Sequence, residues 1–337
     1  MMPGPRGARP SALVLLVLGI LAPPGTGAAQ PGAWVPAVGV LVTQSAATPI
    51  AAQGREAFEQ GLADLGWTPG QTIRIEYRYA EGKPERLDGL ARDLVRLRVD
   101  VIVARATASI QAAKRATPTI PIVMSATGVD PVQLGLVASL ARPGGNITGL
   151  TLLNQDLYAK HLELLKEVIP RLSRVAVIAS PGAPLTPAGH EGLEAGARLL
   201  GLELHHVEVR AADQIDAAFA DIVRARVGAL LVRADPFVLE ANAPRVAALA
   251  LRHRIPLMSW LQTFPQVGAL MSYGADLPSV HRRSAFYVDR LLRGARPADL
   301  PVEEPTRFTL ALSLRTARTL GLTIPPAIMA RANEVIR

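Results

Sequence analysis

From Val35 onward, short apolar runs rich in β-branched residues alternate with longer segments whose apolar residues recur every three or four positions. The short runs have the length of buried strands, and the longer segments have the period of helices with one apolar face. Up to residue 152, this pattern predicts strands at 35–42, 72–79, 99–104, 121–125 and 147–152, and helices at 51–65, 84–97, 107–116 and 132–140.

The same alternation restarts after residue 155. It predicts helices at 155–169, 187–200, 212–225 and 239–253, and strands at 175–179, 203–209, 229–232 and 256–259. Strands separated by helices need crossover connections, so they form parallel sheets whose crossovers are nearly always right-handed. The sequence therefore predicts an α/β fold with two such stacks in tandem.

The remainder of the chain forms a third piece that could add to either stack. It predicts strands at 268–274 and 307–314, a long helix at 277–292, and short helices at 316–320 and 326–330. Because this piece follows two complete stacks, we expect the chain to cross between the two lobes more than once.

The first 29 residues have the composition of a secretory signal. Arg6 and Arg9 precede the apolar stretch 11–22, and small residues follow up to Ala29, after which we expect cleavage. The stretch is shorter than the roughly 20 apolar residues that span a membrane. The chain has no Cys, which a lipid anchor at the processed end would need. We therefore expect an exported, freely diffusing protein without membrane insertion.

The composition adds two constraints. A chain of 337 residues favours two domains. The net charge is +8, of which Arg6 and Arg9 contribute two, and the other basic residues are scattered along helices without forming a block. This distribution indicates a solvated surface and not a nucleic-acid partner.

Polar and small residues stand where the predicted strands end. In parallel α/β sheets, ligands bind beyond the carboxyl ends of the strands. The candidate ligand-binding residues at these ends and on the neighbouring aromatic wall are Gln44, Ser45, Thr107, Ala108, Ser109, Ser125, Ala126, Thr127, Pro181, Gly182, Asp235, Phe237, Trp260, Phe264 and Tyr273.

This set would suit an amino-acid-like solute. Thr107, Ser109 and Thr127, with backbone N–H groups at helix starts, can receive a carboxylate. Asp235 can pair with an ammonium group, and Trp260 can pack against a side chain. Each residue has a structural alternative, because Thr107 and Asp235 can be helix caps and the aromatic residues can be core.

Catalytic and metal-binding patterns are missing from the sequence. It contains no G-x-S-x-G, no G-x-x-x-x-G-K-[ST], and no G-x-G-x-x-G after the first strand. The six His residues are dispersed, and no acid–base pair converges. We expect no enzyme activity, no metal and no cofactor.

Five long stretches resemble one family. They are GLADLGWTPGQTIRIEYRYAEG from Gly61, IPIVMSATGVDPVQLGLVASLARPGGNITGL from Ile120, LLVRADPF from Leu230, GALMSYGAD from Gly268, and YVDRLLRGARPADLPVEEPTRFTLALSLRTARTLGLTIPP from Tyr287. The chain, nearly end to end after the signal, resembles the substrate-binding proteins of ABC transporters in the family whose characterised members bind tryptophan or tyrosine.

The resemblance implies a type I periplasmic binding protein, with two Rossmann-like lobes joined by a three-crossover hinge. Lobe 1 would comprise residues 33–150 with 268–297, and lobe 2 residues 151–267 with 298–337. One stretch differs, because relatives often carry Glu and Arg where this chain reads Trp260-Leu261-Gln262-Thr263. The wall there is less polar, or the solute is different.

The implied function is that of a periplasmic, monomeric solute-binding component of an ABC import system. It would bind a small organic solute, such as an aromatic or other amino acid, and deliver it to a permease driven by an ATPase. Two alternatives remain open: a ligand-sensing receptor for a membrane signalling partner, and an exported enzyme on the same scaffold.

Overall fold

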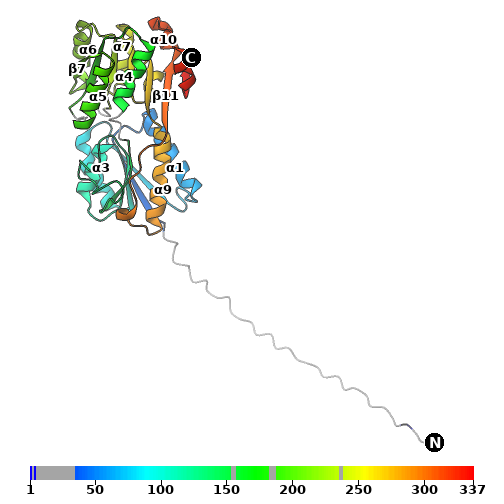
Figure 1. The fold of residues 1–337 in the computed structure, drawn as a ribbon. Helices are drawn as coiled ribbons and strands as arrows, with labels where there is room; N and C mark the ends of the chain where they lie inside the picture. The colour runs from blue at the N-terminus through cyan, green and yellow to red at the C-terminus, as the bar shows by residue number, and fades with distance from the viewer. Residues whose placement is uncertain (2–3, 5–34, 153–156, 182–186, 235–237) are drawn as a thin grey trace. The chain divides into compact units, whose positions relative to one another are not determined.

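The computed structural model describes residues 35–152, 157–181, 187–234 and 238–337, together with Met1 and Gly4 (Figure 1). The chain divides into two units, Met1–Trp34 and Val35–Arg337, and the fold described below is that of the second unit. Most of the predicted signal therefore lies outside the described residues. No helix in the described ranges is long and apolar enough to cross a membrane.

The first sheet has five parallel strands in the order β2-β1-β3-β4-β5. Its strands are β1 (Ala37–Val42), β2 (Arg74–Tyr79), β3 (Val101–Arg105), β4 (Ile122–Thr127) and β5 (Ile147–Thr151). The intervening helices are α1 (Pro49–Asp64), α2 (Leu87–Arg96) and α3 (Thr107–Ala116). This sheet and its helices, with the later helix α9 (Leu277–Leu292), form lobe 1.

Helices cover both faces of the first sheet, which explains its nearly unbroken apolar strands. Alternate residues of β1 point to opposite faces. Val38 and Val40 share a core with Phe58 of α1, whereas Leu41 packs with Leu94 of α2. Helices α1 and α9 lie against each other on the first of these faces.

The second sheet has seven strands in the order β12-β11-β10-β9-β8-β6-β7, with only the β10–β11 pair antiparallel. The strands are β6 (Arg174–Ala179), β7 (Glu203–Glu208), β8 (Ala229–Val232), β9 (Leu257–Ser259), β10 (Met271–Ala275), β11 (Phe308–Ser313) and β12 (Glu334–Ile336). The helices of this lobe 2 are α4 (Leu157–Val168), α5 (Pro187–Leu199), α6 (Ile215–Arg224), α7 (Ala243–Arg252), α8 (Thr263–Gln266), α10 (Leu314–Leu320) and α11 (Pro326–Arg331).

The chain passes between the lobes three times, as the predicted fold class requires. The passes lie between β5 and α4, between β10 and α9, and between residue 303 and β11. Glu303 ties the third pass to lobe 1. Its N–H donates to Gly149 O at 2.9 Å, its carbonyl accepts from Thr151 N at 3.0 Å, and its carboxylate forms a two-pronged ion pair with Arg283 of α9 at 2.9 and 2.8 Å. The two-lobed α/β fold is confirmed.

Two parts of the predicted division differ from the structure. Residues 298–303, predicted for lobe 2, belong to lobe 1, because Val302 N donates to Leu140 O and Glu303 N to Gly149 O. The sequence-based boundary placed residues 268–297 in lobe 1, but β10 belongs to the second sheet, where Met271 and Ser272 lie in register with Met258 and Ser259 of β9. Only the short helix α8 separates these strands, so β10 pairs at once with its predecessor. The second pass therefore lies at Asp276, after β10 and not before it.

The predicted helix at 132–140 is also wrong. Leu134 N donates to Asp130 O and Leu136 N to Pro131 O, which makes a single helical turn. Gly135 then takes a positive φ of 61°, which ends that turn. The segment continues as irregular structure toward β5.

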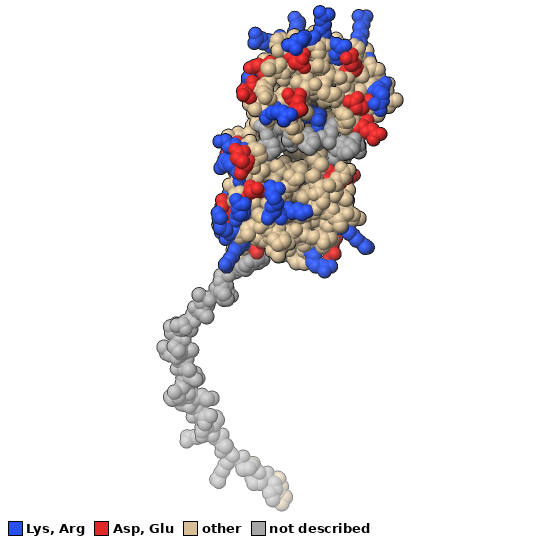
Figure 2. All heavy atoms as spheres, turned by 90° about the vertical axis from the view of Figure 1, so that its left-hand side faces the viewer, with Lys and Arg blue, Asp and Glu red and all other residues tan. Residues whose placement is uncertain are grey.

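Charged side chains lie mostly on the surface. Figure 2 shows Lys and Arg interspersed with Asp and Glu over the face in view. Many are paired, as in the exposed contacts Arg174–Glu203 at 2.7 Å and Arg331–Glu167 at 2.8 Å. Exposed pairs of this kind contribute about 0–1 kcal/mol each, so the charge supports solubility more than folding.

Candidate functional site

The carboxyl ends of β3 and β4 carry two strained alanines on neighbouring strands. Ala106 has φ 67° and ψ 155°, and Ala126 has φ 71°. A residue with a Cβ rarely adopts such angles, and each instance costs about 1–3 kcal/mol, which surrounding contacts must hold in place. Strain of this kind gathers at ligand sites, so this pair marks the edge as a candidate functional site.

The two strained turns are joined side by side. Ala106 N donates to Ser125 O at 3.2 Å, and the hydroxyls of Thr107 and Thr127 lie 3.1 Å apart. We call Ala106, Thr107, Ala126 and Thr127 the double-turn edge. It presents the half-buried Thr107 hydroxyl beside the start of α3, with little side-chain bulk, while Thr127 is fully buried and its hydroxyl donates to Val129 O at 3.0 Å.

The start of α3 lacks a side-chain cap. Its N-cap residue is Ala106, and the Thr107 hydroxyl contacts Thr127, not a helix N–H. The capping role that was the alternative for Thr107 is therefore not what the structure shows. The first N–H groups of a helix are satisfied by caps, water or a ligand, and they favour an anion. Ala108 is half-buried beside them, and the buried Ser109 hydroxyl has no hydrogen-bond partner among the described residues.

Gln44 and Ser45 lie at the end of β1, where they were predicted. Both are half-buried. The Thr43 hydroxyl donates to Gln44 Oε1 at 2.9 Å, and Ser45 O accepts from the Thr48 hydroxyl at 2.8 Å. Thr48 in turn caps α1. These contacts fix the turn after β1, which places both residues at the carboxyl end of the sheet, where the double-turn edge also lies.

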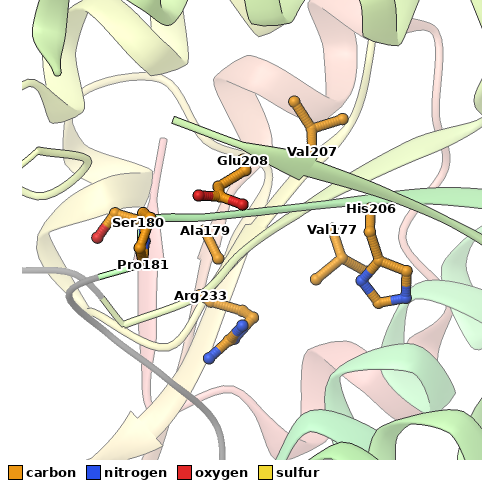
Figure 3. Close-up of a pocket in the computed structure, with 8 residues that line it drawn as sticks. All are labelled: Val177, Ala179, Ser180, Pro181, His206, Val207, Glu208 and Arg233. Carbon is orange, nitrogen blue, oxygen red and sulfur yellow. The ribbon is translucent and has the colours of Figure 1, made fainter. Parts of the chain in front are cut away.

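A cavity of about 340 Å³ lies at the carboxyl ends of β6, β7 and β8 in lobe 2 (Figure 3). Its lining is Val177, Ala179, Ser180, Pro181, His206, Val207, Glu208 and Arg233. Val177 and Ala179 lie in register with His206 and Glu208, so these four side chains share one face of the sheet. The Arg233 guanidinium lies 5.9 Å from the centre of the Tyr158 ring.

Sequence reasoning selected only Pro181 from this cavity. The sequence placed Ser180 and Arg233 at strand ends but not among the candidate residues. Glu208 was missed although it ends β7 and lies one residue before the end of the predicted strand 203–209. The predicted residues Gly182, Asp235 and Phe237 lie outside the described residues.

A smaller cavity shows that the carboxyl edges of the two sheets meet. It is lined by Ile50, Gln53, Gly54, Leu261, Gln262, Thr263, Leu277, Pro278 and His281. The first three belong to α1, which follows β1, and Leu261–Thr263 follow β9. Residues that follow strands of both sheets therefore line one space, which at about 10 Å³ holds no more than a single water molecule.

A family model decides which proteins this chain resembles. The model for ABC transporter substrate-binding proteins matches residues 38–336. The chain belongs to this family. Its members are solute-binding proteins, and the chain is accordingly a substrate-binding protein for a small ligand.

Three similar proteins illustrate the relationship. The chain is 27% identical to the Tyrosine-binding protein of Clostridioides difficile over 282 residues, which are 83% of this chain and 80% of that one. It is 26% identical to a Streptococcus pneumonia ABC domain solved in complex with L-Trp, with a TM-score of 0.82, covering 90% of this chain and 100% of that one. A conserved domain protein from Vibrio cholerae is 29% identical, with a TM-score of 0.81 and the same coverage.

The aromatic residues predicted to line this substrate-binding protein's site are largely buried. Trp260 is 7% exposed, and its Nε1–H donates to Glu240 at 2.9 Å. Phe264 is fully buried in the core, and the half-buried Tyr273 stacks on Phe308. Core packing was the alternative for Trp260 and Phe264, and a direct solute contact from any of the three remains a prediction.

A buried cation lies behind the double-turn edge and was not singled out from the sequence. Arg105, the last residue of β3, is 4% exposed and donates from Nη2 to Gly54 O at 2.8 Å. Its Nε and Nη1 have no partner among the described residues. Burial lowers the pKa of Arg105, while Tyr77, Tyr79 and Glu59 oppose that shift.

Metal binding has no support in the described ranges. No group of three or more His, Cys, Asp or Glu side chains there is placed to hold a metal ion. The polar groups that converge are hydroxyls, backbone N–H groups and arginines, which suit an organic solute with an anionic group.

Proposed function

We propose that this protein is the exported solute-binding component of an ABC import system and that it takes an amino acid, with an aromatic side chain as the first candidate. The observation that carries the proposal is the double-turn edge beside the uncapped start of α3, in a chain of the substrate-binding family. A relative named a tyrosine-binding protein and one solved with L-Trp support the aromatic choice.

In the proposed complex, lobe 1 receives the carboxylate. The Thr107 hydroxyl, which lies 3.1 Å from that of Thr127, and the first N–H groups of α3 supply donors, each helix terminus contributing about 0.3–1 kcal/mol. From lobe 2, Asp235 pairs with the ammonium group, and Pro181 and Arg233 border the solute. A solute that touches both lobes favours the closed arrangement over the open one, and the three passes absorb the rotation.

The proposal includes the setting in which the protein works. A signal cleaved near Ala29 directs the chain to the periplasm, where a monomer delivers its solute to a permease powered by an ATPase. The solute leaves chemically unchanged, since binding and release are the whole task.

Binding to the mature chain, residues 30–337, tests this function. Isothermal titration against the twenty amino acids and a set of small organic acids should find a ligand with a dissociation constant of about 1 μM, or about −8 kcal/mol. Native mass spectrometry of freshly isolated protein should show the same solute retained. Failure of every compound to bind at 1 mM would contradict the proposal, and recovery of a chemically altered solute would contradict its non-catalytic part.

A further inference from the structure

A buried polar network lies directly behind the double-turn edge. His281 of α9 is 6% exposed, and its Nδ1 lies 2.8 Å from the Ser125 hydroxyl of β4. The Ser284 hydroxyl, one helical turn further along α9, lies 2.9 Å from Ser125 Oγ and 3.0 Å from Val280 O. The Ser125 hydroxyl is therefore held between His281 Nδ1 and Ser284, both of them on α9.

Ser125 connects this network to the double-turn edge. Ser125 precedes the strained Ala126, and its carbonyl accepts from Ala106 N, the other strained residue. The pairing of β4 with β5 shifts register between Ser125 and Thr127. Ser125 is thus the last regular residue of β4. Contacts that hold the Ser125 side chain in place therefore also hold the start of the turn at Ala126.

His281 also faces the buried arginine. A Cβ added to Gly54 would lie 2.8 Å from both Arg105 Nη1 and His281 Cδ2, so these two side chains converge on one glycine of α1. Gly54 O accepts from Arg105 at 2.8 Å. The close approach of α1 to this network therefore needs the glycine.

The helix that carries His281 starts at the second pass between the lobes. Asp276 caps α9 and His281 follows one turn later. His281 lines the small cavity together with Leu261 and Gln262 of lobe 2. One imidazole thus contacts the strand that ends in the candidate site, and it lines the space where the two lobes meet.

We infer that His281 is a positioning residue for solute binding: its neutral imidazole, held on α9, fixes Ser125 and so keeps the double-turn edge in the form that receives the solute. The inference rests on the proposed function for the identity of that solute. Nothing requires His281 to touch the solute.

Acidification should oppose this role. Arg105 is the charged group that faces His281, and burial together with that charge holds the pKa of His281 well below its usual range. The other groups around it are neutral: Gln53 from α1, Ser125 from β4, Ser284 from α9, and Gln262 and Thr263 from lobe 2. Beyond Arg105 lie Glu59 and Arg55 of α1, which carry opposite charges. Protonation would place a second cation beside the buried Arg105 guanidinium and so oppose the packing that holds His281 against Ser125.

The test compares His281→Leu, which removes the hydrogen-bond partner of Ser125, with His281→Asn, whose amide keeps a polar atom near Nδ1. Affinities of the mature chain for L-tyrosine and L-tryptophan would be measured between pH 5 and 8. We expect a roughly tenfold loss for His281→Leu and less than threefold for His281→Asn at pH 7.5. We also expect wild-type affinity, but not that of His281→Asn, to weaken toward pH 5. His253→Asn, at an exposed histidine after α7, should behave as wild type.

A double-mutant cycle separates positioning from general destabilisation. If His281 acts through Ser125, then Ser125→Ala combined with His281→Leu should bind no more weakly than the poorer single variant. Additive losses, or unchanged affinity in His281→Leu, would overturn the inference. If His281→Leu does not fold, Ser284→Ala removes the other hydroxyl that contacts Ser125 at smaller cost and should weaken binding in the same direction.

Hydrogen exchange of the ligand-free protein keeps this inference separate from the proposed function. Amides at residues 126–129 should exchange at least threefold faster in His281→Leu than in wild type, and at wild-type rates in His281→Asn. Equal protection in all three proteins would overturn the positioning role whatever the solute. Faster exchange in a protein that binds no amino acid would uphold the positioning role and refute only the proposed solute.

Discussion

At the scale of single residues, the two strained alanines are the strongest sign of function in the structure. Ala106 adopts φ 67° and ψ 155°, a region that is essentially open to glycine alone. Nothing about local propensity favours alanine in this conformation. The position is retained because Ser125, Thr127 and the start of α3 hold it.

Ala106→Gly should therefore stabilise the fold. Relief of about 1–3 kcal/mol of backbone strain exceeds the 0.4–1 kcal/mol that the more flexible unfolded chain costs, which leaves a net gain of about 1 kcal/mol. Urea unfolding of the mature chain measures the change. The matched control is Ala220→Gly on the exposed face of α6, which should lose about 1 kcal/mol. Equal losses at both positions would contradict the strain at Ala106.

The sequence predicted which residues are neighbours where the rule for parallel strand ends was sufficient. Thr107 and Thr127 were predicted to share an edge because adjacent parallel strands end on the same side of a sheet, and their hydroxyls lie 3.1 Å apart. Arg105 and His281 could not be predicted as neighbours, because they lie 176 positions apart in the sequence (281 − 105) and meet only through the way α9 packs across the sheet.

At the scale of elements, periodicity predicted most strands and helices but not which sheet a strand joins. The pattern of residues 268–274 is that of a strand in either lobe, and pairing with β9 and β11 settles its place in lobe 2. The helix expected at 132–140 failed because Gly135 takes a left-handed conformation, which apolar spacing does not report. The three-residue strand β12 was missed since it is too short to show a period.

The close fit of β10 against the end of β9 gives a prediction at this scale. A Cβ on Gly274 would lie 2.1 Å from the carbonyl oxygen of Trp260, a backbone atom that cannot turn aside. Gly274→Ala should therefore force the two strands apart and cost about 1–3 kcal/mol.

Thermal and urea unfolding of Gly274→Ala would be compared with Gly89→Ala. Gly89 lies in α2 with no atom within 4 Å of its added Cβ, so that variant should gain about 0.5–1 kcal/mol. A Gly274→Ala protein as stable as wild type would show that β9 and β10 are not packed as closely as described.

At the scale of the whole molecule, stability should depend on pH through a second buried histidine. His161 of α4 is fully buried between the rings of Tyr158 and Tyr273, and its Nε2–H donates to Tyr273 O at 2.5 Å. Burial lowers the pKa of His161 to about 4. The unfolded chain, with a histidine pKa near 6.5, takes up this proton first.

The lowered pKa of His161 makes the folded state less stable in acid. Above pH 6.5, His161 is neutral in both the folded and the unfolded chain, and its contribution to stability is complete. As the pH falls from 6.5 to 4, stability declines by up to about 3 kcal/mol through this one group. His161→Gln keeps an N–H donor but does not titrate. Between pH 6.5 and 4, the stability of this variant should therefore fall by up to about 3 kcal/mol less than that of the wild type. Curves of equal slope for wild type and His161→Gln in urea titrations would contradict the shift, and the exposed His253→Gln serves as the control.

The anchoring of Glu303 has a consequence for how such a protein can move. Asp276 N donates to Arg307 O at 3.0 Å, so the second and third connections run as one bonded ribbon that continues the β10–β11 ladder. At the lobe 1 end of this ribbon, the backbone of Glu303 hydrogen-bonds to β5 and its carboxylate pairs with Arg283 of α9. Splaying the two connections would break these bonds, whereas torsion along the ribbon preserves them. The easiest motion between the lobes is therefore expected to be a twist about this two-stranded ribbon, with a stiffness set by Glu303 and its partners Gly149, Thr151 and Arg283.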